Sequence, residues 1–332
     1  MKDIYPWQKT DIQRLHELRK RPPNAVLLKG TKGIGKFDLA MNFAQSLLCQ
    51  NPDGFELACG SCSSCRWFEQ ESHPDFRLLQ PEELNRNGEE TETGKKPSKQ
   101  ISVDQVRALA DFVGMSAHQG GKRVVVIYPA EAMNANAANA LLKNLEEPPQ
   151  DLLFILVSHK PQQLLPTILS RCISLALMAP DAENSMNWLK DRGVKCPAEA
   201  LAASGYSPLL AAQSDPQPGS GERDKLLLAL RLPASMDVFE IAEILQKIEQ
   251  ILVVQWLQQW CYDLVSMKLS GRLRYHPGEE ANIRILVEPV DTLRLTRMQK
   301  LLQTAKLEAR HTLNTKLFFE SLLFVYRRLM LG

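Results

Sequence analysis

Residues 30–36 read GTKGIGK, a loop of three glycines ending in a lysine that could bind phosphate groups. Glycines let the backbone N–H groups of such a loop turn toward a phosphate, and the lysine adds a positive charge. The loop follows an apolar run at 25–28 and precedes 37–48, whose apolar residues recur at helical spacing. This order predicts a strand, a phosphate-binding loop and a helix, with these binding residues: Gly30, Gly33, Gly35 and Lys36.

Two groups that would hold and use magnesium are missing around this loop. The residue after the lysine normally offers a hydroxyl to Mg²⁺, and here it is Phe37. An acidic pair is expected at the end of the strand VVVI, but Tyr128 and Pro129 follow it. Glu131 comes two positions later, on a different path from the strand end, and is a poor substitute. We therefore expect a degenerate loop and no ATP hydrolysis by this chain.

Four of the seven cysteines lie close together, namely Cys49, Cys59, Cys62 and Cys65. Four thiolates favour a closed tetrahedral Zn²⁺ site that is structural and has no open position for chemistry. The alternatives are unpaired reduced cysteines or a redox site, and His73 is a reserve ligand. A metal here would hold the insertion 49–65 against its domain.

The segments around these residues alternate between strands and helices in the first half of the chain. Short apolar runs predict five strands, at 25–28, 76–81, 123–128, 152–157 and 172–177. Helical spacing predicts helices between them, at 37–48, 102–113 and 136–147, the second capped by Ser102. Such alternation predicts a parallel sheet with helices on both faces.

The second half of the chain has a different character. The charged stretch 81–100 predicts a surface loop, and the proline and glycine content of 214–224 predicts an interdomain linker. Beyond the linker the pattern is helical, at 239–269 as one or two helices and at 290–310 and 315–331. We expect Trp256 and Trp260 to pack in the core of these helices.

The overall composition is that of an ordinary globular protein. The 332 residues suggest two or three domains, with 44% hydrophobic and 23% charged residues. A net charge of +2 does not by itself indicate a nucleic-acid-binding surface. We find no leader-like start and no apolar run long enough to span a bilayer, so a cytoplasmic location without membrane contact is expected.

The block 135–172 contains NALLKNLEEPP and ILSRC and resembles the clamp-loader family of the AAA+ superfamily. The motif HPDF at 73–76 and the cysteine cluster strengthen this resemblance, which covers roughly 1–215. In the remaining third it rests on length and helicity alone. The resemblance implies an α/β plus α fold with three domains: a nucleotide-binding-type α/β domain at 1–178 with the zinc-binding insertion 49–65, a small helical lid at 179–215 and a helical collar that mediates oligomerisation at 216–332.

The resemblance also implies a function and partners. The family assembles a hetero-pentameric ring that places the sliding clamp on primer–template DNA for a DNA polymerase III holoenzyme. This chain would be its ATPase-inactive stator, without polymerase activity, beside the motor subunits (gamma and tau) and the delta subunit. Motor subunits carry a nucleotide-sensing arginine in the small second domain, and the matching position here is Pro208.

Within ILSRC, the resemblance implies that Arg171 projects into the ATP site of a neighbouring subunit as an arginine finger. An ordinary surface salt bridge is the alternative. Earlier in the same block, Glu146 and Glu147 point roughly 100° apart on a helix and do not form a converging acid–base pair.

Two other functions stay open at this point. The chain could be an active ATP-dependent DNA motor that tolerates Phe37 and Tyr128, which magnesium-dependent turnover by the isolated chain would reveal. It could also be a scaffold of the same fold outside replication, which failure to assemble with motor subunits would favour.

Overall fold

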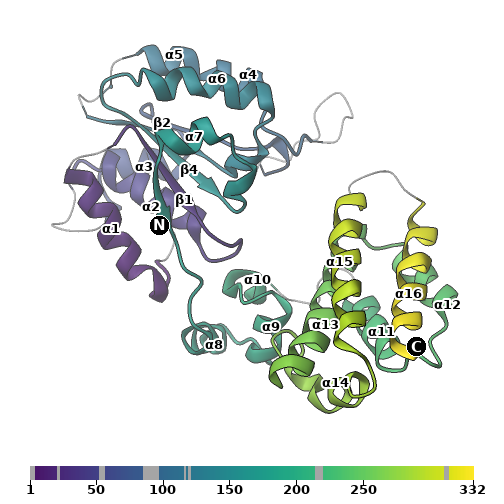
Figure 1. The fold of residues 1–332 in the computed structure, drawn as a ribbon. Coiled ribbons are helices and arrows are strands. Elements are labelled where there is room, and N and C mark those ends of the chain that lie inside the picture. The colour runs from purple at the N-terminus through teal and green to yellow at the C-terminus, as the bar shows by residue number, and fades with distance from the viewer. Residues whose placement is uncertain are drawn as a thin grey trace. The chain divides into compact units, whose positions relative to one another are not determined.

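The computed structural model describes residues 4–20, 23–51, 57–84, 97–115, 117–118, 121–213, 220–309 and 314–332 (Figure 1). The chain divides into two compact units, Met1–Asn184 and Ser185–Gly332.

The first unit is built on one sheet whose five strands all pair in parallel, in the order β2-β3-β4-β1-β5. The register places Val26 of β1 opposite Ile155 of β4 on one side and Ile173 of β5 on the other. The five predicted strands are confirmed, with these bounds: β1 (Ala25–Lys29), β2 (Phe76–Leu79), β3 (Arg123–Ile127), β4 (Leu152–Ser158) and β5 (Ile173–Ala176).

Both faces of this sheet are covered by helices, as Figure 1 shows. Phe154 of β4 packs into the cluster under α4 to α7, and Ile155 packs into the opposite cluster under α1 to α3. Successive strand residues thus enter different cores, so every strand position in the middle of the sheet must be apolar. The helices are α1 (Lys9–Lys20), α2 (Lys36–Leu48), α3 (Ser63–Glu69), α4 (Val103–Arg107), α5 (Leu109–Gly114), α6 (Ala135–Glu146) and α7 (Pro166–Arg171).

One predicted helix, 102–113, is divided into two. Ser102 caps its start as expected, because its hydroxyl accepts a hydrogen bond from the Gln105 N–H at 3.3 Å. The break is at Ala108, whose ψ of −16° tightens the turn between α4 and α5.

The second unit consists of helices, and the predicted change in character is confirmed. Trp256 and Trp260 are buried, and the Trp260 Nε1–H donates to the Tyr326 hydroxyl at 3.0 Å. The segment 239–269 forms two helices rather than one. The helices are α8 (Ala182–Asp191), which begins in the first unit, α9 (Pro197–Ala203), α10 (Pro208–Ala212), α11 (Ser220–Arg231), α12 (Val238–Leu245), α13 (Gln250–Ser270), α14 (Glu280–Val287), α15 (Thr292–Glu308) and α16 (Thr315–Leu331).

Two predicted connections fall partly outside the described residues. The linker expected at 214–224 is wrong in its second half, because α11 begins at Ser220; residues 214–219 lie outside the description. The same holds for 85–96 in the predicted loop 81–100, of which 82–84 form a short 3₁₀ turn. Among the helices that the structure describes, none is long and apolar enough to cross a membrane.

Candidate functional site

The glycine loop connects β1 to α2 at the carboxyl edge of the sheet, as predicted. Gly33 and Gly35 have φ values of 80° and 86°, a conformation that other residues rarely adopt. Gly35 is also the N-cap of α2, and a Cβ there would lie 2.4 Å from the Tyr5 ring. Glycine is therefore required at Gly35 both by the backbone conformation and by the aromatic ring beside it.

Lys36 is turned into the protein and onto its own loop. Its side chain is only 2% exposed, and its Nζ donates to the Thr31 carbonyl at 2.5 Å. Burial lowers the pKa of Lys36 to about 8, against a smaller opposing effect of the Glu131 carboxylate. In this arrangement the amine is bound by a backbone carbonyl of the loop.

The N-terminal segment fixes the backbone of the same loop from outside. A short 3₁₀ turn, Pro6–Gln8, carries two side chains that donate to loop carbonyls. The Trp7 Nε1–H reaches the Ile34 carbonyl at 3.0 Å, and the Gln8 Nε2–H reaches the Gly35 carbonyl at 2.8 Å. The side chains of Trp7 and Gln8 thus hold the conformation of the glycine loop.

The two positions that would serve magnesium in an active ATPase contact each other. Phe37 in the first turn of α2 packs on Tyr128, which follows β3, with ring centroids 4.3 Å apart. Both side chains join the apolar cluster under α1 to α3. The contact therefore places two aromatic rings where a hydroxyl and a carboxylate would be needed.

Glu131 binds the backbone of the neighbouring strand end. Its Oε1 accepts the His159 N–H at 2.9 Å, while its buried Oε2 has no hydrogen-bond partner among the residues that the structure describes. The His159 ring meets Tyr128 edge-on, and burial, with a smaller effect of Lys36, lowers the pKa of His159 to about 3. Sequence reasoning did not single out His159, although its place at the end of a buried strand was a usable signal.

Arg171 is the last residue of α7 and lies at the surface of the first unit. Its side chain is 34% exposed, and its Nη2 is 2.7 Å from Oε1 of Glu146, the last residue of α6. Its Nη1 donates to the Thr167 carbonyl at 3.0 Å. The arginine has the surface salt bridge that was one predicted alternative, and it also keeps a third of its surface open.

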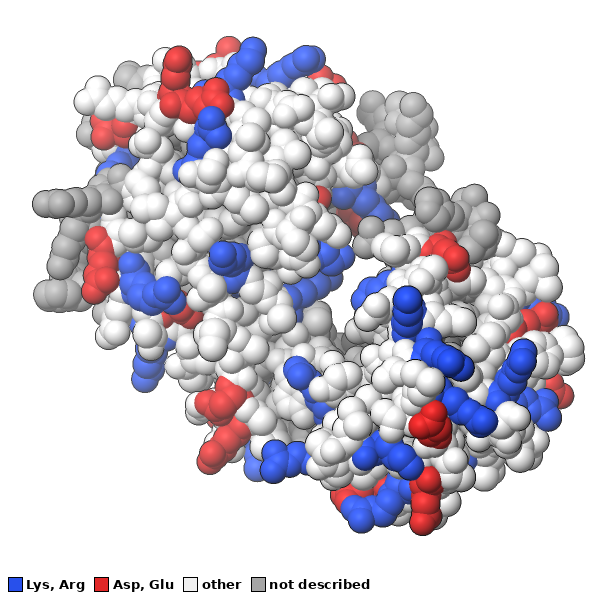
Figure 2. All heavy atoms as spheres, viewed as in Figure 1, with Lys and Arg blue, Asp and Glu red and all other residues white. Residues whose placement is uncertain are grey.

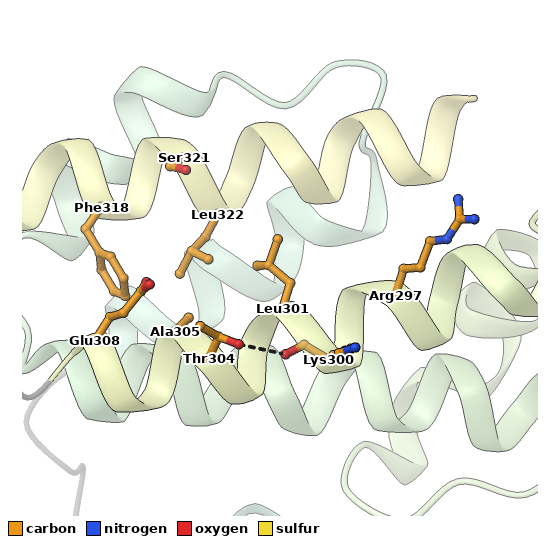
Figure 3. A pocket seen from close by; sticks show the side chains of 9 residues that line it. All are labelled: Arg297, Lys300, Leu301, Thr304, Ala305, Glu308, Phe318, Ser321 and Leu322. Carbon is orange, nitrogen blue, oxygen red and sulfur yellow. Dashed lines mark hydrogen bonds between the residues drawn. The ribbon is translucent and has the colours of Figure 1, made fainter.

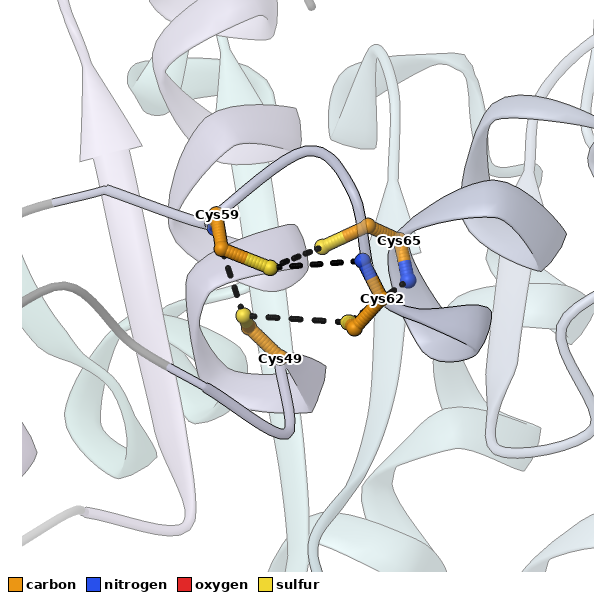
Figure 4. A group of neighbouring side chains, drawn as sticks. All are labelled: Cys49, Cys59, Cys62 and Cys65. Atoms are coloured by element: carbon orange, nitrogen blue, oxygen red, sulfur yellow. Dashed lines mark hydrogen bonds between the residues drawn. The ribbon is translucent and has the colours of Figure 1, made fainter.

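The four clustered cysteines converge, as Figure 4 shows. Their Sγ atoms all lie within 4.8 Å of one another, and two pairs, Cys49–Cys62 and Cys59–Cys65, are 4.0 Å apart. Tetrahedral zinc with Zn–S bonds of about 2.3 Å requires sulfurs roughly 3.8 Å apart, so the group fits zinc with little movement. The sulfurs come from the end of α2, the following loop and α3.

Hydrogen bonds prepare one of these sulfurs for a metal. N–H and hydroxyl groups of Ser61, together with the Cys62 N–H, lower the pKa of Cys59 to about 6. Burial raises the pKa of Cys49 and Cys65. A cation at the centre of the group would reverse that effect, because it stabilises the thiolate form.

His73, the reserve ligand, is outside the group of ligand atoms found among the described residues. Its Nδ1 accepts the Asp75 N–H at 3.0 Å, so Nε2 carries the proton and donates to the Ser64 hydroxyl at 2.8 Å. The hydroxyl in turn donates to the Leu48 carbonyl at 2.5 Å. This series of hydrogen bonds joins the residues next to Cys49 and Cys65. The sequence did not reveal this role of His73.

The second unit has a groove between α15 and α16, shown in Figure 3, of about 490 Å³. Its floor includes Leu301, Phe318 and Leu322, and Arg297 and Lys300 stand on its edge. Figure 2 shows lysine and arginine side chains gathered on the face where these two helices lie. Glu308 also lines the groove, which thus combines an apolar floor with two basic side chains and one acidic side chain.

Comparison with known proteins identifies the family. The sequence profile described as "DNA polymerase III, delta subunit" matches residues 7–181. The DNA polymerase III subunit delta′ of Pseudomonas aeruginosa is 40% identical over 276 residues, which are 81% of this chain and 80% of that protein. The chain belongs to the DNA polymerase III delta′ family. The predicted resemblance to clamp-loader proteins is confirmed.

Other members of the family match over shorter stretches. The delta′ subunit of Escherichia coli is 34% identical over 202 residues, 60% of this chain and 56% of that protein. Among solved structures, a gamma subunit-related protein of Thermotoga maritima aligns with 95% of this chain and 99% of its own, at 18% identity and a TM-score of 0.43. A similarity at that level carries no functional argument.

Proposed function

We propose that this chain is the ATPase-inactive stator of a bacterial clamp loader and that it supplies Arg171 to the ATP site of a neighbouring motor subunit. The membership of the delta′ family supports the assignment to the loader. The inactive site and the role of Arg171 rest on the geometry of the first unit.

The contact between Phe37 and Tyr128 carries the proposal of inactivity. Hydrolysis of ATP needs a magnesium ligand after the loop lysine and a carboxylate at the strand end. Two packed aromatic rings offer neither, and Lys36 is bound to the Thr31 carbonyl. The Glu131 carboxylate accepts a backbone N–H with one oxygen. We infer that Gly30, Gly33, Gly35 and Lys36 keep the shape of a phosphate loop without its activity.

The position of Arg171 at the surface supports its proposed role as an arginine finger. A finger must reach a second protein, which requires a permanently charged group at the surface. Arg171 ends a short helix, and its guanidinium is open to solvent on one side. Its donors to Thr167 and Glu146 leave other N–H groups free for a phosphate among the residues described.

The exposed apolar residues of the second unit support a collar that assembles the ring. Leu317, Phe324 and Leu331 recur every seven residues on α16 and are 61%, 42% and 54% exposed. Phe239 of α12 extends this face by packing edge-on against Phe324. Exposed apolar faces of this kind indicate protein partners.

We propose domains at 1–178, 179–215 (lid) and 216–332 (collar).

The remaining parts of the proposal follow from membership of the loader. The partners are the motor subunits (gamma and tau) and delta in a hetero-pentameric ring, the sliding clamp, and primer–template DNA inside the complex. The chain would act in the cytoplasm, where the chromosome is replicated. The four cysteines would hold one structural Zn²⁺ that stabilises the 49–65 insertion without taking part in catalysis.

The test is DNA- and clamp-stimulated ATP hydrolysis by the loader reconstituted from the same organism. We expect Arg171→Ala to leave the ring assembled and to slow hydrolysis at the receiving site by roughly a thousandfold. Arg107→Ala, an exposed arginine of the same unit in a surface pair, is the matched control and should have no effect. Unchanged hydrolysis in an assembled Arg171→Ala ring would remove the finger role. Magnesium-dependent turnover by the isolated wild-type chain would overturn the inactive site.

A further inference from the structure

Arg171 has more partners than a free surface arginine would have. Its Nη2 is 2.7 Å from Glu146 Oε1, and its Nη1 donates to the Thr167 carbonyl at 3.0 Å and to the Ser170 hydroxyl at 3.4 Å. The Ser170 hydroxyl itself donates to the Thr167 carbonyl at 3.0 Å. The guanidinium plane is therefore anchored at two of its three nitrogens.

Glu146, which pairs with Arg171 from the end of α6, has a fixed position. Glu146 is the last residue of α6, and its neighbour Leu145 is buried in the core between this helical layer and the sheet. Glu147 leaves the helical conformation, with φ −122° and ψ 69°, before Pro148. The carboxylate thus comes from the end of a helix that is packed on one side and stopped on the other.

Helix electrostatics make Glu146 unusual in its place. The C-terminal end of a helix carries a partial negative charge, which disfavours an acidic side chain and favours a basic one. Arg171 lies at the end of α7 and beside the end of α6. Its positive charge therefore offsets the partial negative charge at both helix ends. Since half-exposed ion pairs contribute little to stability, folding stability alone is a weak reason for this pair.

We propose that Glu146 is a positioning residue for Arg171, holding the guanidinium ready for the phosphate of a neighbouring subunit. This inference rests on the proposed function of Arg171. The carboxylate fixes one Nη2–H, and the α7 oxygens take the Nη1 hydrogens. The Nε–H and the second Nη2–H have no partner among the described residues, so the arginine can bind phosphate without releasing Glu146.

The gain comes from ordering the side chain before the phosphate arrives. A long arginine side chain loses rotamer freedom when it binds, and a side chain that is already ordered loses less. We therefore expect Glu146→Ala to lower kcat for hydrolysis by roughly three- to tenfold, a smaller loss than removal of the arginine. Binding of ATP is the task of the neighbouring subunit, so KM for ATP should not change.

The experiment compares reconstituted loader rings containing wild type, Glu146→Ala, Glu146→Gln, Arg171→Ala and the double variant Glu146→Ala/Arg171→Ala. Glu147→Gln is the matched control, because it changes the adjacent exposed carboxylate, which is not paired with Arg171. We expect Glu146→Gln to keep part of the activity, since an amide oxygen still accepts the Nη2–H. In the double variant, loss of Glu146 should add nothing to the loss of Arg171.

The outcomes separate this inference from the proposed function. If Arg171→Ala does not slow hydrolysis, the finger role itself is wrong. If Arg171→Ala slows hydrolysis while Glu146→Ala leaves kcat unchanged or raises it, the finger stands and the positioning role is overturned. An equal effect of Glu147→Gln, or an additive effect in the double variant, would also overturn it. Ring assembly and thermal unfolding of Glu146→Gln show whether any loss reflects misfolding.

Discussion

The rings of Phe37 and Tyr128 pack against each other at an interplanar angle of 31°, and this contact joins two changes that look separate in the sequence. One ring stands where a hydroxyl would bind magnesium, and the other where a carboxylate would bind it. Because the rings contact each other, restoring one polar group alone would place it against the remaining ring. The two changes are therefore parts of one packed contact rather than unrelated features of the sequence.

The aromatic pair should show a measurable coupling energy. We expect Phe37→Ala and Tyr128→Ala each to lower the free energy of unfolding by about 1–3 kcal/mol, and the double variant to lose about 0.5–1.5 kcal/mol less than the sum. Urea denaturation measures these values. Phe37→Ala combined with Phe112→Ala, which packs on the other face of the sheet, should be additive. Additivity in both pairs would mean that the rings do not pack in solution.

Lys36 should be dispensable for hydrolysis by the assembled loader. Its amine binds the Thr31 carbonyl, and no magnesium ligand follows it, so Lys36→Met removes nothing that the ring uses. We expect rings with Lys36→Met to hydrolyse ATP at the wild-type rate, measured beside rings with Arg171→Ala. A loss as large as that of Arg171→Ala would show that the loop takes part in the ATP cycle after all.

The same lysine predicts a dependence of stability on pH. The pKa of Lys36 is about 8 in the folded chain and 10.5 ordinarily, so between these values the folded chain has lost a proton that the unfolded chain keeps. The free energy of unfolding therefore rises with pH across this window. Below pH 8 the amine is charged in the folded chain, so the full cost of burying that charge lowers the stability.

Comparison with Lys36→Met isolates this effect from other titrating groups. From pH 7 to 10 the free energy of unfolding of the wild type should rise relative to Lys36→Met, by at most about 3 kcal/mol. A difference that stays constant over this range would show that folding does not lower the pKa of Lys36.

Removal of the metal should loosen the first unit. We expect the purified chain to contain about one zinc ion and to unfold at a lower temperature after chelation, because the binding free energy of the ion no longer holds the four cysteines together. Metal analysis and thermal unfolding check this. Cys65→Ser should lose the zinc, while Cys196→Ser, an isolated exposed cysteine, should keep it. A zinc-free chain with unchanged stability would contradict a structural site.

His73 should support the metal without binding it. Its hydrogen-bond chain through Ser64 to Leu48 holds the two sides of the cysteine group together. Loss of such outer support typically lowers metal affinity by about 10- to 100-fold, and we expect a loss in this range for His73→Ala. Competition with a coloured chelator measures it, with exposed His118→Ala as the control. Equal zinc retention by both variants would remove the supporting role.

Much of this architecture was readable from the residues themselves. Continuous apolar runs such as LLFILV predict strands that are buried on both faces, and the described sheet places each of them as expected. The spacing of Cys59, Cys62 and Cys65 predicts a shared metal ion, and the four sulfurs do converge. These features are local, so period, spacing and turn residues are enough to predict them.

The sequence by itself determined the strands, most helices, the glycine loop, the cysteine group and the absence of the magnesium ligands. Only the tertiary structure decided that Phe37 meets Tyr128, that His73 ties Ser64 to the cysteine group, and that Glu146 pairs with Arg171. Phe37 and Tyr128, and likewise Glu146 and Arg171, are far apart along the chain. Their contacts depend on the order of strands in the sheet and on how helices end against it, and neither is encoded in any local period.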